Sequence, residues 1–268
     1  MINLILEKLS EEAASAKSIF KGTGERAFPR HFYIDNLLPE ELARNIFNSF
    51  PDVQMMRRMD TFREKKFTSK SFDKFKPLIS EITFAFQHKE VVERVQEITG
   101  ITDQVPDPTL YAGGISAMGL GHHLGPHIDN SHDSSGKLYR TLNLLYYITP
   151  DWLPKNGGNL ELWDKKVKNR VTVESKFNRL VVMETNPLAW HSVSEVTVDR
   201  LRCCVSNYYF SPRSPTGVNY SNVTSFSARP EQPVRRAVAW VDGKVRQAVR
   251  WLAPSGLGKK DVFEGPTK

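Results

Sequence analysis

The pattern of apolar residues changes near residue 108, and this change limits the fold more than any other feature of the chain. Beyond it, helical spacing gives way to short alternating or β-rich runs, which are separated by turn residues such as Asn156-Gly157-Gly158. The runs predict about eight strands, near residues 109–118, 124–130, 139–149, 158–164, 170–174, 179–184, 189–194 and 200–211. Short strands that follow a helical layer favour a β-sandwich or jelly-roll barrel with helices packed on one sheet.

The first 107 residues supply the helical layer. Apolar residues at helical spacing predict three helical stretches: from Ile2 until Gly22 and Gly24 break the pattern, from Leu38 until Pro51, and from about Pro77 to Thr99. A short apolar run predicts a strand at residues 31–34. Residues 52–76 are charged and show no clear period, so we expect an irregular, solvated loop there.

Length and charge define the expected domain organisation. A chain of 268 residues can bury a full core, and we expect one domain over residues 1–211, with a helical part (1–107) and a jelly-roll core (108–211). The fold class is mainly β with α, in the α+β class. Residues 1–210 carry 27 Lys and Arg against 26 Asp and Glu, whereas residues 211–268 carry 10 against 4. Because the positive charge belongs to the tail, no nucleic-acid partner is expected.

Residues 212–268 form a basic C-terminal extension in this interpretation. Val234, Val238, Val241 and Val245 share one face of a predicted amphipathic helix over residues 234–252. Packing of this helix on the barrel or in a homodimer is favoured. Peripheral contact with an anionic membrane surface, or with another polyanion, stays open.

The two cysteines, Cys203 and Cys204, are adjacent and cannot easily form an unstrained disulfide. Their arrangement predicts a reducing compartment. No apolar run reaches the ~18 residues that span a bilayer. The first residues are mildly acidic and amphipathic, unlike a secretion signal. We therefore expect a cytoplasmic protein.

One group of polar residues suggests a metal site. In a strand, residues two apart point to the same face, so His127 and Asp129 would present an imidazole and a carboxylate side by side. His191, from a distant strand, would add a third metal ligand beside them. Two histidines and one carboxylate with open positions opposite is the ligand set of non-haem Fe(II) oxygenases.

Further motifs occur in a fixed order around these residues. They are His127-Ile128-Asp129, Tyr146-Tyr147, Gly157-Gly158-Asn159-Leu160, Phe177-Asn178-Arg179-Leu180 and His191-Ser192-Val193, followed by a basic residue. In this order the chain resembles the Fe(II)- and 2-oxoglutarate-dependent dioxygenases, particularly their prolyl-hydroxylase-like branch. The resemblance covers roughly residues 108–211, and it implies a double-stranded β-helix (jelly-roll, cupin-like) core.

The resemblance also implies a function. It identifies an enzyme that uses Fe(II), 2-oxoglutarate and O₂, with ascorbate as a candidate stimulant, to hydroxylate an unactivated C–H bond while 2-oxoglutarate becomes succinate. His127, Asp129 and His191 are then the catalytic metal ligands. Segments before the barrel often form lids in this family, so a charged lid over residues 52–76 is the alternative to a solvated loop. Such a lid would select an anionic substrate.

The far carboxylate of 2-oxoglutarate needs a cation, and the planar fork of arginine suits a carboxylate. The resemblance places a basic residue about ten positions after the distal histidine, where Arg200 and Arg202 both qualify. Counting forward from His191 favours Arg200, whereas counting back from the end of the strand favours Arg202, which we predict. Tyr147, on the inward face of its strand, is the predicted second contact to the cosubstrate.

Other functions stay open at this stage. A non-catalytic jelly-roll binding protein would keep the fold without turnover, and a zinc hydrolase would use the same three ligands. Within the hydroxylase class, a small-molecule substrate is preferred because the chain shows no peptide-binding module. A prolyl or peptidyl substrate and a sugar or glycolipid are the alternatives. The sequence decides neither the oxidised position nor the choice between hydroxylation and desaturation.

Overall fold

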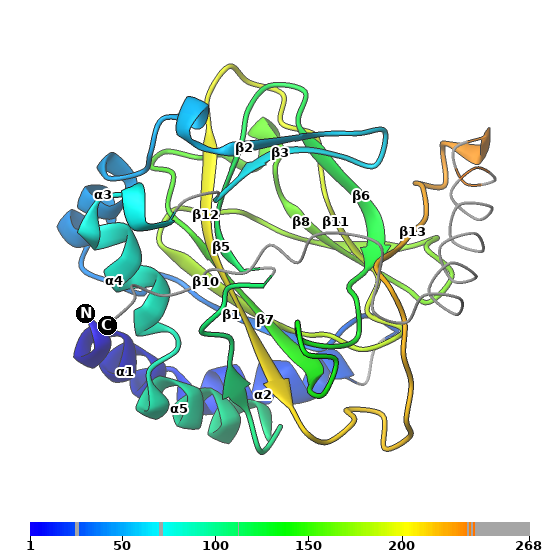
Figure 1. Ribbon diagram of the computed structural model, residues 1–268, viewed down its shortest axis with the longest axis horizontal. Helices are drawn as coiled ribbons and strands as arrows, with labels where there is room; N and C mark the ends of the chain where they lie inside the picture. The colour runs from blue at the N-terminus through cyan, green and yellow to red at the C-terminus, as the bar shows by residue number, and fades with distance from the viewer. Residues whose placement is uncertain (25–26, 70–71, 112, 235, 237, 239–268) are drawn as a thin grey trace.

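The computed structural model describes residues 1–24, 27–69, 72–111, 113–234, 236 and 238, and it places a curled antiparallel sheet beside a layer of helices (Figure 1). The helices are α1 (Ile2–Glu11), α2 (Ala13–Gly24), α3 (Glu40–Asn48), α4 (Pro77–Ala85) and α5 (Lys89–Thr99). Short 3-10 helices lie at Val53–Met55, Phe72–Lys74 and Pro154–Asn156.

Local sequence explains where the helices begin and end. Pro77 occupies the first turn of α4, where its missing N–H costs no hydrogen bond. Gly100 follows α5 with a φ of 69°, the left-handed conformation that commonly ends a helix. The single helix expected over residues 77–99 is wrong, because the chain turns between Ala85 and Lys89. This turn lets α4 pack against β12 (Arg202–Ser211) while α5 packs against α1 and α2.

The remaining strands form one continuous curled sheet. They are β1 (His31–Ile34), β2 (Arg57–Asp60), β3 (Glu64–Thr68), β4 (Val105–Pro106), β5 (Gly114–Met118), β6 (His123–Ile128), β7 (Tyr139–Tyr147), β8 (Leu160–Trp163), β9 (Arg170–Val173), β10 (Arg179–Glu184), β11 (His191–Val193) and β13 (Ser225–Phe226). Their order, with β12, is β1-β10-β7-β12-β5-β3-β6-β11-β8-β9. Strands that are consecutive in the chain, such as β5 and β6, lie in opposite halves of the sheet. This is the jelly-roll arrangement of a double-stranded β-helix, and the predicted fold is confirmed.

Alternation along β7 separates the two sides of this sheet. Every second side chain belongs to the core beneath the helices, namely Leu142, Leu144 and Tyr146. The side chains between them line a cavity inside the curled sheet, namely Asn143, Leu145 and Tyr147. Figure 1 shows the helices on the outer side of β1, β10, β7 and β12. The helix layer therefore closes one face, and the functional groups gather on the other.

Two segments differ from the sequence-based expectation. Residues 52–76 are not an irregular loop, since β2 and β3 form a hairpin that bridges the two halves of the sheet: β3 pairs with β5 at Phe67 and with β6 at Lys65. Its charged side chains, such as Arg57, Glu64 and Lys66, line a cavity while Phe67 packs against the core, so no regular hydrophobic alternation marks the hairpin. Residues 225–226 of the expected extension add β13 to β6.

Other expectations concern the surface and the tail. The helix expected over residues 234–252 falls mainly outside the described residues. Among the helices that are described, none has the length and apolar character needed to cross a bilayer.

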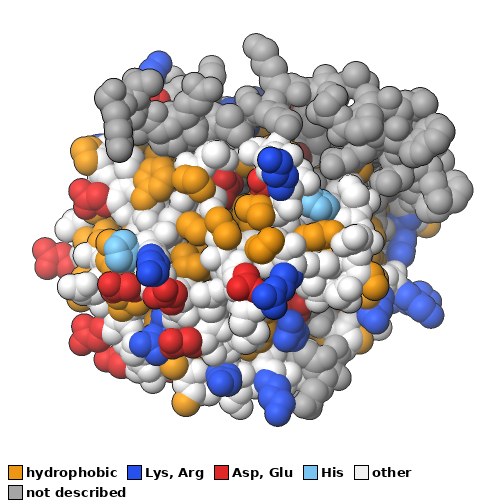
Figure 2. All heavy atoms as spheres, turned by 60° about the horizontal axis from the view of Figure 1, so that its bottom comes forward, with side chains coloured by type: hydrophobic (Ala, Val, Ile, Leu, Met, Phe, Trp, Pro, Cys, Tyr) orange, Lys and Arg blue, Asp and Glu red, His pale blue; other side chains and the backbone are white. Residues whose placement is uncertain are grey.

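On the face in Figure 2, acidic and basic side chains both surround a central group of exposed hydrophobic side chains, in keeping with the near balance of charge over residues 1–210.

Asn178 ties the segment after β1 to the sheet. Its φ of 60° is unusual for a residue other than glycine, and its side chain is 2% exposed. The side-chain oxygen accepts hydrogen bonds from the Leu38 N–H at 3.1 Å and from the Tyr146 hydroxyl at 2.8 Å. The side-chain amide donates to the Leu38 carbonyl at 2.6 Å. One buried amide therefore satisfies three polar groups of other elements.

Replacement of this amide should destabilise the protein. We expect Asn178→Ala to lower the free energy of unfolding by about 2–4 kcal/mol, because buried polar groups lose their partners and alanine is strained at positive φ. Asn178→Gly removes the same hydrogen bonds without that strain and should lose about 1 kcal/mol less. Urea denaturation followed by circular dichroism measures both. Stabilities within ~0.5 kcal/mol of the unsubstituted protein would contradict this role.

Candidate active site

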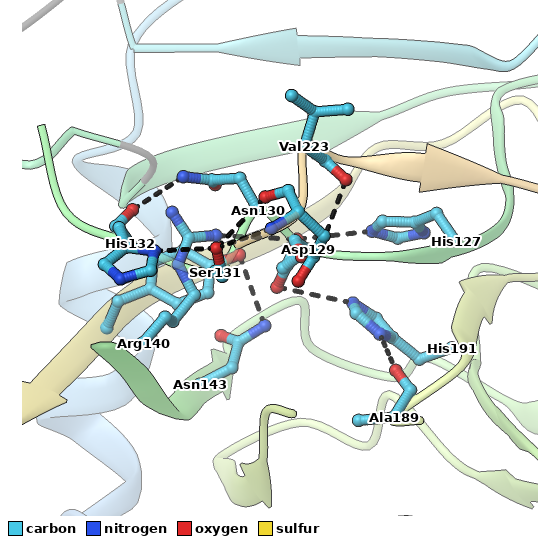
Figure 3. Close-up of polar contacts among 12 residues, drawn as sticks. His127, Asp129, Asn130, Ser131, His132, Arg140, Asn143, Ala189, His191 and Val223 are labelled. Atoms are coloured by element: carbon cyan, nitrogen blue, oxygen red, sulfur yellow. Dashed lines mark hydrogen bonds and ion pairs between the residues drawn. The ribbon is translucent and has the colours of Figure 1, made fainter. Parts of the chain in front are cut away.

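The pairing of β6 with β11 brings two distant histidines together. His127 lies directly opposite His191 in the register, and the ring centroids are 4.1 Å apart. β6 ends at Ile128, so Asp129 stands just beyond the strand rather than within it. Its carboxylate still turns toward both rings, with oxygens 3.6 Å from His127 Nε2 and 3.8 Å from His191 Nε2 (Figure 3). The sequence-based grouping of these three residues matches their placement.

Hydrogen bonds orient both imidazoles. Nδ1 of His127 lies 3.0 Å from the carbonyl oxygen of Gly125, and Nδ1 of His191 lies 3.0 Å from that of Ala189. Because a carbonyl oxygen only accepts, each Nδ1 carries the proton and donates it. Each Nε2 then directs a lone pair toward Asp129, which is the arrangement found in histidines that bind metals.

The donor atoms are suited to a divalent metal ion. One ligand atom from each of His127, Asp129 and His191 lies within 4.8 Å of the others. Oδ2 of Asp129 is buried and accepts no hydrogen bond from the described residues. Two imidazole nitrogens and one carboxylate oxygen suit Fe(II) and leave the opposite coordination positions open. The residues present therefore fit the ion that the sequence motifs imply.

A buried arginine balances the charge of Asp129. Arg140 is 2% exposed, its Nη1 lies 3.5 Å from Asp129 Oδ1, and its guanidinium carbon lies 4.1 Å from the centroid of the Tyr208 ring. Burial alone would raise the pKa of Asp129, but Arg140 and the two imidazoles outweigh it and hold that pKa well below its usual range. The carboxylate is therefore ionised and available as a ligand at neutral pH.

The environment of His191 favours its neutral form. Burial, together with the neighbouring His127 ring, lowers the pKa of His191 to about 4, against the opposing influence of Asp129. A neutral imidazole is the form that binds a metal, so this histidine needs no proton removed near neutral pH.

His127, Asp129, Arg140 and His191 line a cavity of about 760 Å³. Its inner wall comes from the strands of the barrel and includes Met118, Asn143, Leu145, Tyr147, Leu160, Val193, Arg202, Cys204, Ser206 and Tyr208. Its outer wall includes residues of the β2–β3 hairpin, namely Arg57, Met59, Thr61, Arg63, Glu64, Lys66 and Thr68. The segment expected as a solvated loop or a lid thus lines the cavity.

The two candidate arginines occupy different environments. Arg202 is 3% exposed and lines the cavity, where its Nη2 contacts the Met118 sulfur at 2.8 Å and its Nε has no hydrogen-bond partner among the described residues. Arg200 instead donates to the carbonyl groups of Pro150 and Asp151 at the surface. A thioether is a weak acceptor, so Arg202 is a buried cation suited to an incoming anion.

Tyr147 and Cys204 lie beside Arg202. The guanidinium carbon of Arg202 is 5.3 Å from the centroid of the Tyr147 ring. Burial raises the pKa of Tyr147, so its hydroxyl stays protonated and can donate to an anion. Burial also raises the pKa of Cys204 to about 11, so the side chain is a thiol rather than a nucleophilic thiolate.

Sequence reasoning missed Arg140 because of a β-bulge. Strict alternation from Tyr147 points Thr141 into the barrel and Arg140 away from it. The register with β12 shifts between Tyr209 and Phe210, and this bulge turns Arg140 toward Asp129. Thr141 instead bonds Gln104 and the backbone outside the cavity. The inward direction of Arg140 depends on how β7 pairs with β12, and the residue pattern of β7 alone does not show that pairing.

The other histidines do not join the metal ligands. His122 packs against Phe67 with ring centroids 5.0 Å apart, and His132 packs against Tyr139 at 4.4 Å. His123 pairs with Lys65 of the hairpin. None of these three is among the residues that line the main cavity.

Known proteins resemble the barrel part of the chain. Residues 113–210 match the family model described as the 2OG-Fe(II) oxygenase superfamily. The prolyl 3-hydroxylase OGFOD1 of Xenopus laevis is 32% identical over 95 residues, and that of Mus musculus is 31% identical over 86. These matches cover 32% and 29% of this chain, and they span only 19% and 16% of the relatives' own length.

Solved structures share the fold at low sequence identity. A prolyl 4-hydroxylase of Pseudomonas putida superposes with a TM-score of 0.55 and 14% identity, covering 73% of this chain and 98% of that one. A prolyl hydroxylase of Trichoplax adhaerens, in complex with a peptide of hypoxia inducible factor, gives a TM-score of 0.53 and 16% identity, covering 76% and 92%. Both likenesses support the double-stranded β-helix.

The low pKa of His191 predicts a pH dependence of stability in the metal-free protein. An unfolded histidine takes up a proton near pH ~6.5, whereas folded His191 does so only near pH 4. As the pH falls through this window, the unfolded chain binds the extra proton, and the free energy of unfolding should fall by up to about 3 kcal/mol from this residue.

Urea denaturation of the metal-free protein between pH 7 and pH 4 measures this loss. His191→Asn lacks the titrating group, so its stability should decline less over the same window. Equal declines for the two proteins would show that His191 does not titrate as its surroundings imply.

Proposed function

We propose that the protein is a 2-oxoglutarate-dependent dioxygenase, which hydroxylates an unactivated C–H bond of its substrate while 2-oxoglutarate is converted to succinate. The match of residues 113–210 to the 2OG-Fe(II) oxygenase superfamily supports this proposal. One observation carries this proposal. His127, Asp129 and His191 converge at the floor of a cavity whose wall holds Arg202, a buried cation without a carboxylate partner among the described residues.

Each residue has a separate task. His127, Asp129 and His191 would hold Fe(II), and Arg202 would bind the far carboxylate of 2-oxoglutarate with help from the Tyr147 hydroxyl. When bound, the ion and the cosubstrate supply the oxidising power, with O₂ as the oxygen source. The barrel wall keeps these groups out of bulk water, where charged contacts would be screened.

The alternative functions explain less of the site. A zinc hydrolase accounts for the three ligands but leaves the buried charge of Arg202 without a purpose. A binding protein without turnover accounts for the cavity, but not for two imidazole nitrogens that point toward one ionised carboxylate. We therefore favour the oxygenase.

The substrate belongs to the proposal as well. A small molecule is the first candidate, and the basic side chains Arg57, Arg63 and Lys66 along the outer cavity favour one with an anionic group. Peptidyl proline is the second candidate, because the named relatives are prolyl hydroxylases. The free, buried thiols of Cys203 and Cys204 support a cytoplasmic location. The proposal also includes a homodimer contact or a peripheral membrane contact through residues 234–252.

Loss of the carboxylate ligand should abolish turnover. Succinate release is measured with Fe(II), 2-oxoglutarate and O₂ against a panel of anionic metabolites and proline-containing peptides. Asp129→Ala and metal-stripped protein should both give no succinate above background, and Fe(II) should restore activity to the stripped protein only. Asp133→Ala, which removes a carboxylate in the following loop, is the matched control and should stay active. Turnover by Asp129→Ala at the original rate would exclude the assigned metal site.

Loss of the cavity arginine should weaken cosubstrate binding. Arg202→Met should raise the KM for 2-oxoglutarate by at least about 30-fold, because one partner of a buried charge pair is removed. Arg200→Met, two residues away at the surface, should change that KM less than about twofold. Initial rates across a range of 2-oxoglutarate concentrations measure both. The reverse ranking would assign the cosubstrate contact to Arg200.

A further inference from the structure

Residues 222–229, here called the strap, lie beyond the part of the chain that matches the family model, yet they complete the strand that carries the metal motif. β3 pairs with the beginning of β6 and then diverges from it. At the other end of β6 the strap takes its place, with Phe226 opposite His127. The Ser227 N–H donates to the Pro126 carbonyl at 2.7 Å. Without the strap, this end of β6 would be an open edge.

Asn222 holds the turn that follows the strand. Its side-chain amide donates to the backbone carbonyl of Asp129 at 2.8 Å. Its backbone N–H donates to the Ser131 hydroxyl at 2.9 Å, and its carbonyl accepts from the Ser131 N–H at 3.0 Å. Asp129 stands outside regular strand pairing, so these contacts fix the backbone from which its carboxylate reaches the site.

Phe226 covers one face of a metal-binding ring. Its ring stacks on His127 with centroids 5.4 Å apart and an interplanar angle of 21°. The same side chain lines the cavity. Together with the hydrogen bond from Nδ1 to Gly125, this contact restricts the rotation of the imidazole.

Arg229 anchors the strap to the strands on the far side of His191. Its guanidinium pairs with Glu161 of β8 at 2.6 Å and donates to the Val193 carbonyl of β11 at 3.3 Å. Glu161 is 3% exposed and also accepts a hydrogen bond from the Ser192 hydroxyl, next to His191, at 2.6 Å. The strap thus contacts β6 at one end and the β8–β11 pair at the other.

We propose that the strap is a clamp that sets the metal affinity of the site by holding His127 and Asp129 in register with His191. The inference rests on the proposed metal site, and it assigns positioning roles to Asn222, Phe226 and Arg229. Outer contacts of this kind commonly change metal affinity about 10- to 100-fold, because they determine how well ligands are placed before the ion arrives.

Titration of the metal-free, full-length protein with Mn(II), followed by the electron paramagnetic resonance signal of free Mn(II), tests the clamp without turnover. Arg229→Met and Asn222→Ala should each raise the dissociation constant at least about 10-fold, and Arg229→Lys should recover part of the loss. Arg213→Met is the matched control, since Arg213 pairs with Asp103 at the exposed surface and should bind Mn(II) normally. Circular dichroism and thermal unfolding of each metal-free variant show whether the fold is retained.

Glu161 also forms an ion pair with Arg170 of β9 at 3.2 Å, so it keeps one cationic partner in Arg229→Met, and a second variant removes its charge as well. Glu161→Gln combined with Arg229→Met removes the pair together and should still bind Mn(II) at least about 10-fold more weakly. Unchanged affinity in folded strap variants would overturn the clamp and leave the metal site standing. Mn(II) binding lost only in proportion to unfolding would also overturn it. An unsubstituted protein that binds no Mn(II) would overturn the proposed function and the clamp together.

Discussion

The site depends on one pairing, that of β6 with β11, which sets His127 against His191 across two halves of a curled sheet. The pairing brings residues 64 positions apart in the chain within contact of one carboxylate. The curled sheet achieves this because most successive strands from β5 to β12 alternate between its halves, so strands distant in sequence become neighbours. A shift of one residue in the register would turn one imidazole to the opposite face of the sheet, and the three ligands would no longer meet.

Charge burial explains the composition of the cavity. A buried carboxylate or guanidinium is costly unless it is paired, and one cavity gathers Asp129, Arg140 and Arg202. Arg140 offsets the charge of Asp129, and burial keeps His191 in its neutral form near neutral pH. Arg202 contacts the Met118 thioether and the Tyr147 ring but forms no ion pair with a carboxylate of the described residues, so the protein carries a buried cation in advance of its ligand. Such preorganisation favours binding of a carboxylate without rearrangement of the wall.

The sequence predicted what depends on local pattern. The strands beyond residue 108 and the inward direction of Tyr147 follow from alternation, which short-range sterics impose. The grouping of His191 with His127 and Asp129 depends on a long-range strand pairing, and the order of motifs, rather than local pattern, indicated it. The hairpin over residues 57–68 was not predicted because its charged side chains face a cavity and leave no apolar period. The role of Arg140 was not predicted because a bulge reverses the alternation of β7. The strap was not predicted because the residues that it contacts lie far away in the chain.

A crystal structure of the protein loaded with Mn(II) and 2-oxoglutarate, with the ion located by its anomalous scattering, shows whether the three residues hold a metal together. One ion is expected within about 2.3 Å of Nε2 of His127, a carboxylate oxygen of Asp129 and Nε2 of His191. An ion bound elsewhere, or one that leaves the His191 ring without contact, would contradict this expectation.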